Sequence, residues 1–230
     1  SAPTVTLASS ANSMTEGDSA LTLTASLSVA TTGAVTVTLD TSGSAIEGTD
    51  YSNVSDITIA AGATTGTASF TVTDDSVYEG SEAATVTIGS VSGGSASAAG
   101  SGTSASITLA DNESAPTVNL SSSSASVTED GSAITLTATL SNIADEAVTV
   151  PITTSGTATE GTDYATISDI TIAAGATTGT ASITPTDDSV SEGIETLVVS
   201  LGTLSGADAT AGSTSSISLN LVDDDVPNIT

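Results

Sequence analysis

The chain alternates hydrophobic and hydroxyl-bearing residues over many short stretches. Residues 21–27 read Leu-Thr-Leu-Thr-Ala-Ser-Leu, and residues 35–39 read Val-Thr-Val-Thr-Leu. A period of two places the aliphatic side chains on one face of a β-strand and Thr or Ser on the other. Clusters of Gly, Ser and Asp separate these stretches, as is typical of turns. The pattern predicts strands at residues 4–15 (interrupted), 21–27, 35–39, 57–59, 67–73, 83–89 and 104–110.

The same pattern of strands and turns occurs twice. The segment DITIAAGATTGTAS occupies residues 56–69 and recurs unchanged at residues 169–182. Likewise, the segment EGTDY at residues 47–51 recurs at residues 160–164. Self-similarity at one fixed spacing is typical of tandem repeats.

These matches divide the chain into repeats at residues 1–113 and 114–225. Residues 226–230 resemble the start of a repeat, which predicts that the array continues with a further one. Seven short strands in each repeat predict an all-β fold of two tandem seven-stranded antiparallel β-sandwich domains with an immunoglobulin-like shape. The chain begins without a signal peptide, so we expect it to be a segment of a longer protein.

The composition excludes several classes of function. The chain contains 27 acidic residues and no Lys, Arg or His, so none of its carboxylates has a basic side chain to pair with. Nucleic acids and anionic membrane surfaces are excluded as partners, because both are bound through basic residues. No apolar run is long enough to insert into a membrane. Catalytic triads, thiolates and Schiff-base lysines are also impossible, and we expect no enzymatic activity.

The acids gather at one end of the predicted sandwich. If successive strands reverse direction, the loops after the first, third and fifth strands share that end with the tail of the seventh. The loops at the opposite end of the first repeat, residues 28–34, 60–66 and 90–103, contain no acid. In the second repeat only Asp145, Glu146 and Asp208 fall at that opposite end. A solvated acidic coat would instead spread its charges along the outward strand positions, which are Thr and Ser.

Carboxylates crowded together repel one another unless a cation lies between them. Zinc favours His or Cys, and both are absent. Magnesium requires a near-ideal octahedron with several waters, whereas calcium accepts six to eight flexible oxygen ligands. The clusters therefore predict Ca²⁺ as the bound ion, with two or more ions in each domain.

These acids also resemble those of a known family. The run Thr-Asp-Asp-Ser-Val-Tyr-Glu-Gly-Ser-Glu at residues 73–82 is similar to a loop of Calx-β domains, as found in tandem in large bacterial surface proteins. The resemblance extends to residues 15–17, to residues 47–51 and to the acidic triplet at residues 111–113, and it covers both repeats. It implies calcium ligands, including backbone carbonyls at the two valines, at Glu16, Asp50, Asp74, Asp75, Val77, Glu79, Glu82, Asp111, Asn112, Glu113, Glu129, Asp163, Asp187, Asp188, Val190, Glu192, Glu195, Asp223, Asp224 and Asp225.

Other repeated residues are better explained by structure than by metal binding. We expect Glu47, Glu160, Asp56 and Asp169 to stabilise turns. Tyr51 and Tyr164 are expected to pack in the core.

Three functions remain open at this stage. The first is a calcium-binding structural repeat of a long extracellular or cell-surface protein, an adhesin stalk or filament in which Ca²⁺ rigidifies the loops and the interdomain joints. Its partners would be calcium ions, neighbouring repeats, and other copies in a filament or a cell-surface target. The alternative is a calcium-dependent recognition module that binds carbohydrate or a cell-surface protein. A cytosolic calcium sensor is a third possibility, disfavoured because we expect the array to continue.

Overall fold

The computed structural model describes residues 2–225, and these form only β-strands, turns and irregular segments. They divide into two units, which correspond to the two repeats except that Ser76–Glu79 and Glu113 belong to the second unit. The first unit consists of Ser1–Asp75 and Gly80–Asn112, and the second of Ser76–Glu79 and Glu113–Thr230. Within residues 2–225 there is no helix that meets the length and hydropathy needed to cross a membrane. The predicted further repeat at residues 226–230 lies outside the described residues.

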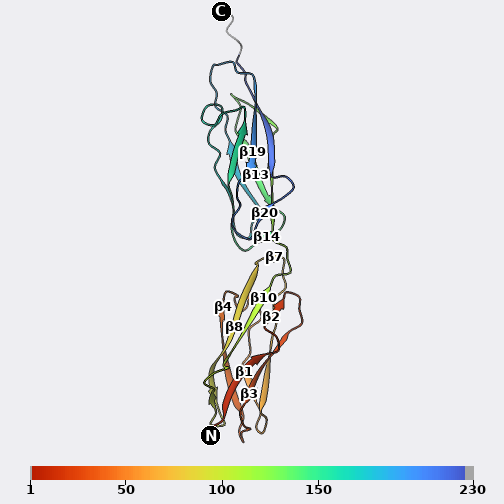
Figure 1. Cartoon of the computed structure of the whole chain (residues 1–230), viewed down its shortest axis with the longest axis vertical. Coiled ribbons are helices and arrows are strands. Elements are labelled where there is room, and N and C mark those ends of the chain that lie inside the picture. Colours follow the sequence, from red (N-terminus) through yellow and green to blue (C-terminus); the bar gives the residue numbers. More distant parts are fainter. Residues whose placement is uncertain (1, 226–230) are drawn as a thin grey trace, which may run out of the picture. The chain divides into compact units, whose positions relative to one another are not determined.

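The first unit consists of two facing sheets (Figure 1). One sheet has the strand order β6–β3–β1–β9, and the other has the order β2–β10–β8–β4–β5. The bounds are β1 Thr4–Ser9, β2 Ser13–Thr15, β3 Leu21–Leu27, β4 Val35–Gly43, β5 Ile57–Ile59, β6 Thr65–Phe70, β8 Ser81–Ser92, β9 Ser97–Ala98 and β10 Ser104–Ala110. Every predicted strand is present. However, β6 begins and ends earlier than predicted, and β4 and β8 are longer.

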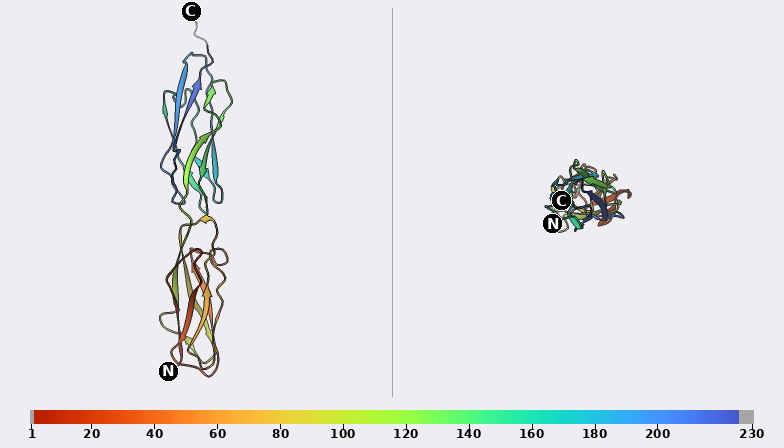
Figure 2. Two further views of the ribbon diagram at one scale, coloured as in Figure 1. Left: turned by 90° about the vertical axis from the view of Figure 1, so that its right-hand side faces the viewer. Right: turned by 90° about the horizontal axis from the view of Figure 1, so that it is seen from above.

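The second unit repeats this arrangement, and Figure 2 shows it from another side. Its sheets have the orders β18–β13–β11–β20 and β12–β21–β19–β16, with β15 and β17 forming a separate pair. The bounds are β11 Thr117–Ser122, β12 Ser126–Thr128, β13 Ile134–Leu140, β15 Val148–Val150, β16 Ile152–Gly156, β17 Ile170–Ile172, β18 Thr178–Ile183, β19 Ile194–Leu201, β20 Thr210–Ala211 and β21 Ser216–Val222.

One difference between the repeats follows from a proline. Strand β4 runs without a break in the first unit, but its register on β8 shifts between Thr38 and Leu39. Pro151 occupies the place of Thr38 in the second unit, and there the strand divides into β15 and β16. Proline has no N–H for a ladder and is therefore confined to bulges and strand ends.

Each unit has its own core, built from the inward positions of the alternating strands. In β3 the residues Leu21, Leu23, Ala25 and Leu27 are buried, while the intervening Thr and Ser are partly or fully exposed. Each fully buried aliphatic side chain stabilises the fold by about 1.5–3 kcal/mol. Aromatic residues are few, and the largest buried side chains are tyrosines that are 1% exposed in both units. The predicted core role of Tyr51 and Tyr164 is therefore confirmed, and Tyr51 stacks on Phe70 with the ring centroids 4.7 Å apart.

The first strand of each repeat is split between the two sheets, and this split matters for the acids. Strand β1 pairs antiparallel with β3, whereas β2 crosses to the other sheet and pairs in parallel with the last strand, β10. The pair therefore departs from the purely antiparallel arrangement that we predicted. Since parallel strands end at the same edge of a sheet, the residues that follow β2 and β10 come close together. The same parallel pair joins β12 and β21 in the second unit.

A short segment of the first repeat belongs to the second unit. Within that unit, β7 (Val77–Tyr78) pairs in parallel with β14 (Ile143–Ala144). The Tyr78 hydroxyl donates a hydrogen bond to Asp208 at 2.9 Å, and the backbone N–H of Ala207 donates to Glu146 at 3.1 Å. Two of the three acids outside the predicted acidic end, Glu146 and Asp208, therefore accept hydrogen bonds.

Candidate metal centre

The turn formed by the repeated EGTDY segment presents a buried aspartate. In the first repeat the Asp50 side chain accepts a hydrogen bond from the N–H of Ile46, which closes a tight turn. Its backbone carbonyl accepts from the N–H of Thr73 at 2.8 Å, which ties the turn to the loop after β6. Asp163 makes the equivalent contacts with Thr159 and Thr186 in the second repeat. Both aspartates are nearly buried, being 9% and 6% exposed.

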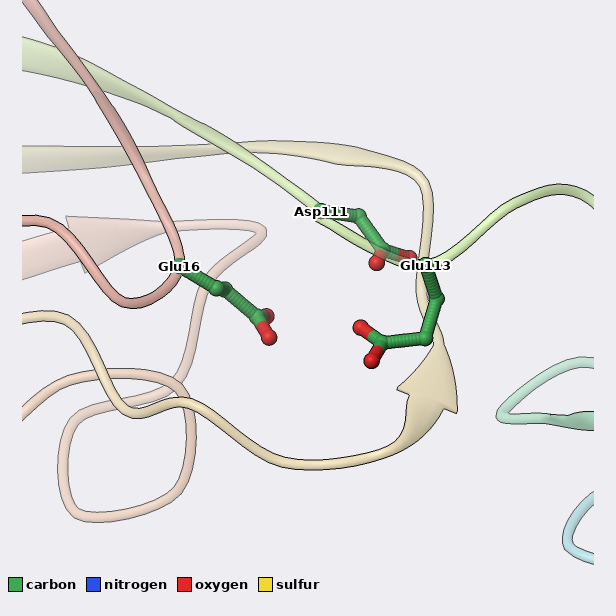
Figure 3. A group of neighbouring side chains, drawn as sticks. All are labelled: Glu16, Asp111 and Glu113. Carbon is green, nitrogen blue, oxygen red and sulfur yellow. The ribbon is translucent and has the colours of Figure 1, made fainter.

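The parallel pair of β2 and β10 brings a second set of acids together. Thr15 lies opposite Ala110 at the end of this pair, and the N–H of Glu16 donates to the carbonyl of Ala110 at 3.0 Å. Glu16 and Asp111 therefore begin from neighbouring points of the backbone. Figure 3 shows the carboxylates of Glu16 and Glu113 facing each other, with Glu16 on one segment of chain and Asp111 and Glu113 together on another.

Among the described residues, the carboxylates form four groups of three, and each repeat contains two of these groups. In every group, one oxygen from each residue lies within 4.8 Å of the others. We name each group after its first residue: Glu16 with Asp111 and Glu113; Asp50 with Glu79 and Glu82; Glu129 with Asp188 and Asp225; Asp163 with Glu192 and Glu195. All twelve residues belong to the ligand set implied by the sequence.

The other predicted ligands lie outside these groups but close to them. In the first repeat, Asp74 accepts a hydrogen bond from the side-chain amide of Asn112 at 2.7 Å. The N–H of Asp75 donates to Glu16 at 3.5 Å, and Val77 lies in β7.

In the second repeat the N–H of Val190 donates to Asp188 at 2.7 Å, and the Val190 side chain is exposed. Asp187 and Asp224 are exposed, and their charges act on Asp225. Asp223 accepts hydrogen bonds from the backbone N–H groups of Glu192, Gly193 and Asp225.

Electrostatic repulsion is marked around Glu129, which is 4% exposed. Burial raises the pKa of Glu129 to about 7, and the charges of Asp223, Glu192 and Asp188 add to this effect. Burial also raises the pKa of Glu195, with a further contribution from its neighbour Asp163. For Asp225, burial and the charge of Asp223 raise the pKa. An ionised cluster of this kind has a high free energy unless a cation is present.

Asp223 shows the opposite behaviour. Hydrogen bonds from the backbone N–H groups of Gly193 and Asp225 lower the pKa of its carboxyl group, which therefore remains ionised beside Glu129. Asp223 positions the loop before β19 and also keeps a negative charge at the site.

The oxygens of the second repeat fit a hard cation. Glu129 Oε2, Glu195 Oε2 and Asp225 Oδ2 are buried and have no hydrogen-bond partner among the described residues. A buried oxygen without a donor is costly, and a cation coordinated by several such oxygens removes the cost. Carboxylates from four segments, with no nitrogen or sulfur ligand, are the donor set of calcium. The twelve grouped residues would hold it.

Of the four acids that we expected to stabilise turns, three accept backbone hydrogen bonds. Glu47 accepts hydrogen bonds from the N–H of Val54 and the hydroxyl of Thr41. Asp56 accepts from the N–H of Leu39 at 3.2 Å, and Asp169 from that of Ile152 at 3.0 Å. Glu160 forms an isolated β-bridge with Tyr164 through its backbone.

Comparison with known protein families identifies the repeats. The model of the Calx-beta domain matches the chain twice, at residues 1–113 and at residues 111–225. The chain belongs to the Calx-beta family. Calx-beta domains are calcium-binding modules, and this chain contains two in tandem. No curated protein sequence matches it significantly.

Several solved structures are similar to this pair of Calx-beta domains. The CBD12 structure of CALX1.2 is 16% identical, with 95% of this chain and 99% of that chain covered and a TM-score of 0.42. The apo-form Calx CBD1 domain is 19% identical, with 49% of this chain and 100% of that chain covered and a TM-score of 0.42. A two-domain protein of unknown function from Bacteroides fragilis is 9% identical, with 96% and 93% covered and a TM-score of 0.39.

The raised pKa of Glu129 predicts how the metal-free second Calx-beta domain responds to pH. Between about pH 4.5 and 7 the folded domain keeps a proton on Glu129 that the unfolded chain has lost. Protonation therefore stabilises the fold in this range, and the stabilisation is lost as the pH rises through 7. We expect the urea midpoint of this domain in EGTA to fall between pH 5.5 and pH 8. A constant midpoint, or one that rises, would contradict the electrostatics described here.

Proposed function

We propose that this chain is a calcium-binding structural repeat of an extracellular or cell-surface protein. Two or more Ca²⁺ ions bind in each domain, at the ligands named above. They join the loops after the first, third and fifth strands to the tail of the last strand, and so make this end of the sandwich rigid.

The observation that carries this proposal is the buried carboxylate of Glu129. Its Oε2 lacks a hydrogen-bond partner among the described residues, and four other carboxylates act on it electrostatically. The chain has no Lys, Arg or His that could neutralise these charges. A divalent cation from solution supplies what the chain lacks, and each ion offsets two negative charges.

Calcium at extracellular concentrations suits sites of this kind. The ligands come mostly from loops, and extracellular calcium modules bind with dissociation constants of about 10⁻⁴ to 10⁻³ M. Calcium outside cells is of the same order, so the sites would be about half filled or more there. Two groups of carboxylates in each repeat support a count of at least two ions per domain.

Calcium also bears on the connection between the domains. The connecting residues 112–116 directly follow Asp111, and Glu113 is itself a member of the Glu16 group. A cation that binds Glu16, Asp111 and Glu113 would fix the start of this connection to the body of the first domain. In a longer array, the same contact would keep successive repeats extended, as a stalk requires.

Small-angle X-ray scattering tests this role. We expect the scattering in calcium to fit a narrow range of interdomain separations, and the scattering in excess EGTA to fit a wider range. Magnesium at the same ionic strength is the control, because screening of the 27 negative charges also changes the dimensions of the chain. Identical profiles in calcium and EGTA, from protein shown to bind calcium, would exclude the stalk function.

A further inference from the structure

The two repeats differ in the triplet that follows the last strand. Thr15 lies opposite Ala110, and Thr128 lies opposite Val222, so the residues after Ala110 and Val222 correspond one to one. The triplet is Asp-Asn-Glu in the first repeat and Asp-Asp-Asp in the second. Asn112 therefore occupies the position of Asp224.

In the first repeat this position supplies a hydrogen-bond donor. The Asn112 amide Nδ2 donates to Asp74 Oδ1 at 2.7 Å. An amide N–H carries a partial positive charge, which offsets part of the negative charge of a carboxylate that accepts it. Asp74, the first acid of the loop after β6, therefore already has one such donor from within the chain.

The triplet of the second repeat contains no amide side chain. Asp187 corresponds to Asp74, and the residue that corresponds to Asn112 is Asp224, whose carboxylate carries no N–H. The charges of Asp224 and Asp187 both act on Asp225, whose buried Oδ2 has no hydrogen-bond partner among the described residues. A cation from solution would offset the charge of these carboxylates.

We infer that the Asn112 amide replaces one calcium ion in the first repeat, so that this repeat binds one ion fewer than the second and the two repeats fill at different calcium concentrations. The inference rests on the proposed function and adds an order of filling to it. The second repeat fills first, because its triplet has three carboxylates where the first has two. The first repeat then responds to calcium over a higher range of concentrations.

The substitution Asn112→Asp tests this inference directly. It removes the donor and restores the acidic triplet of the second repeat. We expect the calcium count per chain, measured by equilibrium dialysis and elemental analysis, to rise by one. In calorimetric titration, the dissociation constant of the weakest class of sites should fall by at least about tenfold. This is a typical effect of one group that supports a metal site.

Matched variants test whether the effect of Asn112→Asp on the calcium count depends on Asp74. Adding Asp74→Asn to Asn112→Asp should return the count to that of the wild type. The reciprocal change Asp224→Asn should lower the calcium count by one. It places in the triplet of the second repeat the same amide side chain that Asn112 provides in the first. Circular dichroism at saturating calcium verifies that each variant remains folded.

The outcomes separate this inference from the proposed function. If the wild type binds no calcium, the proposed function itself fails. If the wild type binds calcium but Asn112→Asp leaves both count and affinity unchanged, only the inference is overturned, and Asn112 acts as a neutral oxygen ligand. A lower count for Asn112→Asp would overturn it as well.

Discussion

Removing calcium is expected to lower the thermal unfolding midpoint of this chain by about 20 °C. A ligand present at 100 times its dissociation constant stabilises the native state by about 2.7 kcal/mol per site. For sites with a dissociation constant of about 10⁻⁴ M, this condition is met at about 10 mM free calcium. Two ions then contribute about 5 kcal/mol to each domain, and each kcal/mol corresponds to roughly 4 °C for domains of this size.

The measurement compares calorimetric scans in 10 mM CaCl₂ and in excess EGTA, each adjusted to the same ionic strength with NaCl. The salt control is essential, because a chain with a net charge of −27 is stabilised by screening alone. Equal midpoints in the two solutions would contradict calcium binding at the carboxylate groups.

Glu129→Gln is expected to change stability in opposite directions with and without calcium. In EGTA near pH 8, the substitution removes a buried negative charge that Asp223 and Glu192 repel, so the midpoint of the second domain should rise by roughly 4 °C or more. In calcium, it removes a ligand, and the domain should lose the contribution of about one ion, which corresponds to a fall of about 10 °C. Substitution of a residue with a purely structural role would shift the unfolding midpoints in EGTA and in calcium in the same direction.

Two further variants make this test specific. Asp130→Asn removes a charge from the adjacent residue, which is exposed and outside the four groups, and should leave the calcium response intact. Glu16→Gln is the equivalent change in the first repeat and should reduce the calcium response of the first domain only. If Glu129→Gln shifts the midpoint in the same direction in both solutions, Glu129 is not a calcium ligand.

Much of the candidate site was predictable because the alternation along the strands is so regular. Thr and Ser occupy most outward positions, so the acids are left in loops or, as with Glu82 in β8 and Glu195 in β19, at the second residue of a strand. Loops that follow alternate strands share one end of a sandwich. This reasoning and the family resemblance both select the carboxylates of the four groups. No residue of those groups was missed.

The grouping within the site was not predictable. Glu16 meets Asp111 because β2 changes sheets and runs parallel to β10, and the sequence pattern does not distinguish this from a continuous antiparallel strand. Asp223 accepts hydrogen bonds from the backbone N–H groups of Glu192 and Gly193 and so orders the neighbouring loop. These contacts join residues 31 and 30 positions apart, and local periodicity contains no information about them.

The sequence by itself determined the two-repeat organisation, the β-sandwich class and the set of acids, because each depends on residue type and local period. The tertiary structure decided which oxygens lie within 4.8 Å of one another and which become buried. It also decided that Asp74 is hydrogen-bonded to the Asn112 amide. The physical reason is that burial and charge repulsion act through space, so they depend on how β2, β10 and the loops between strands come together.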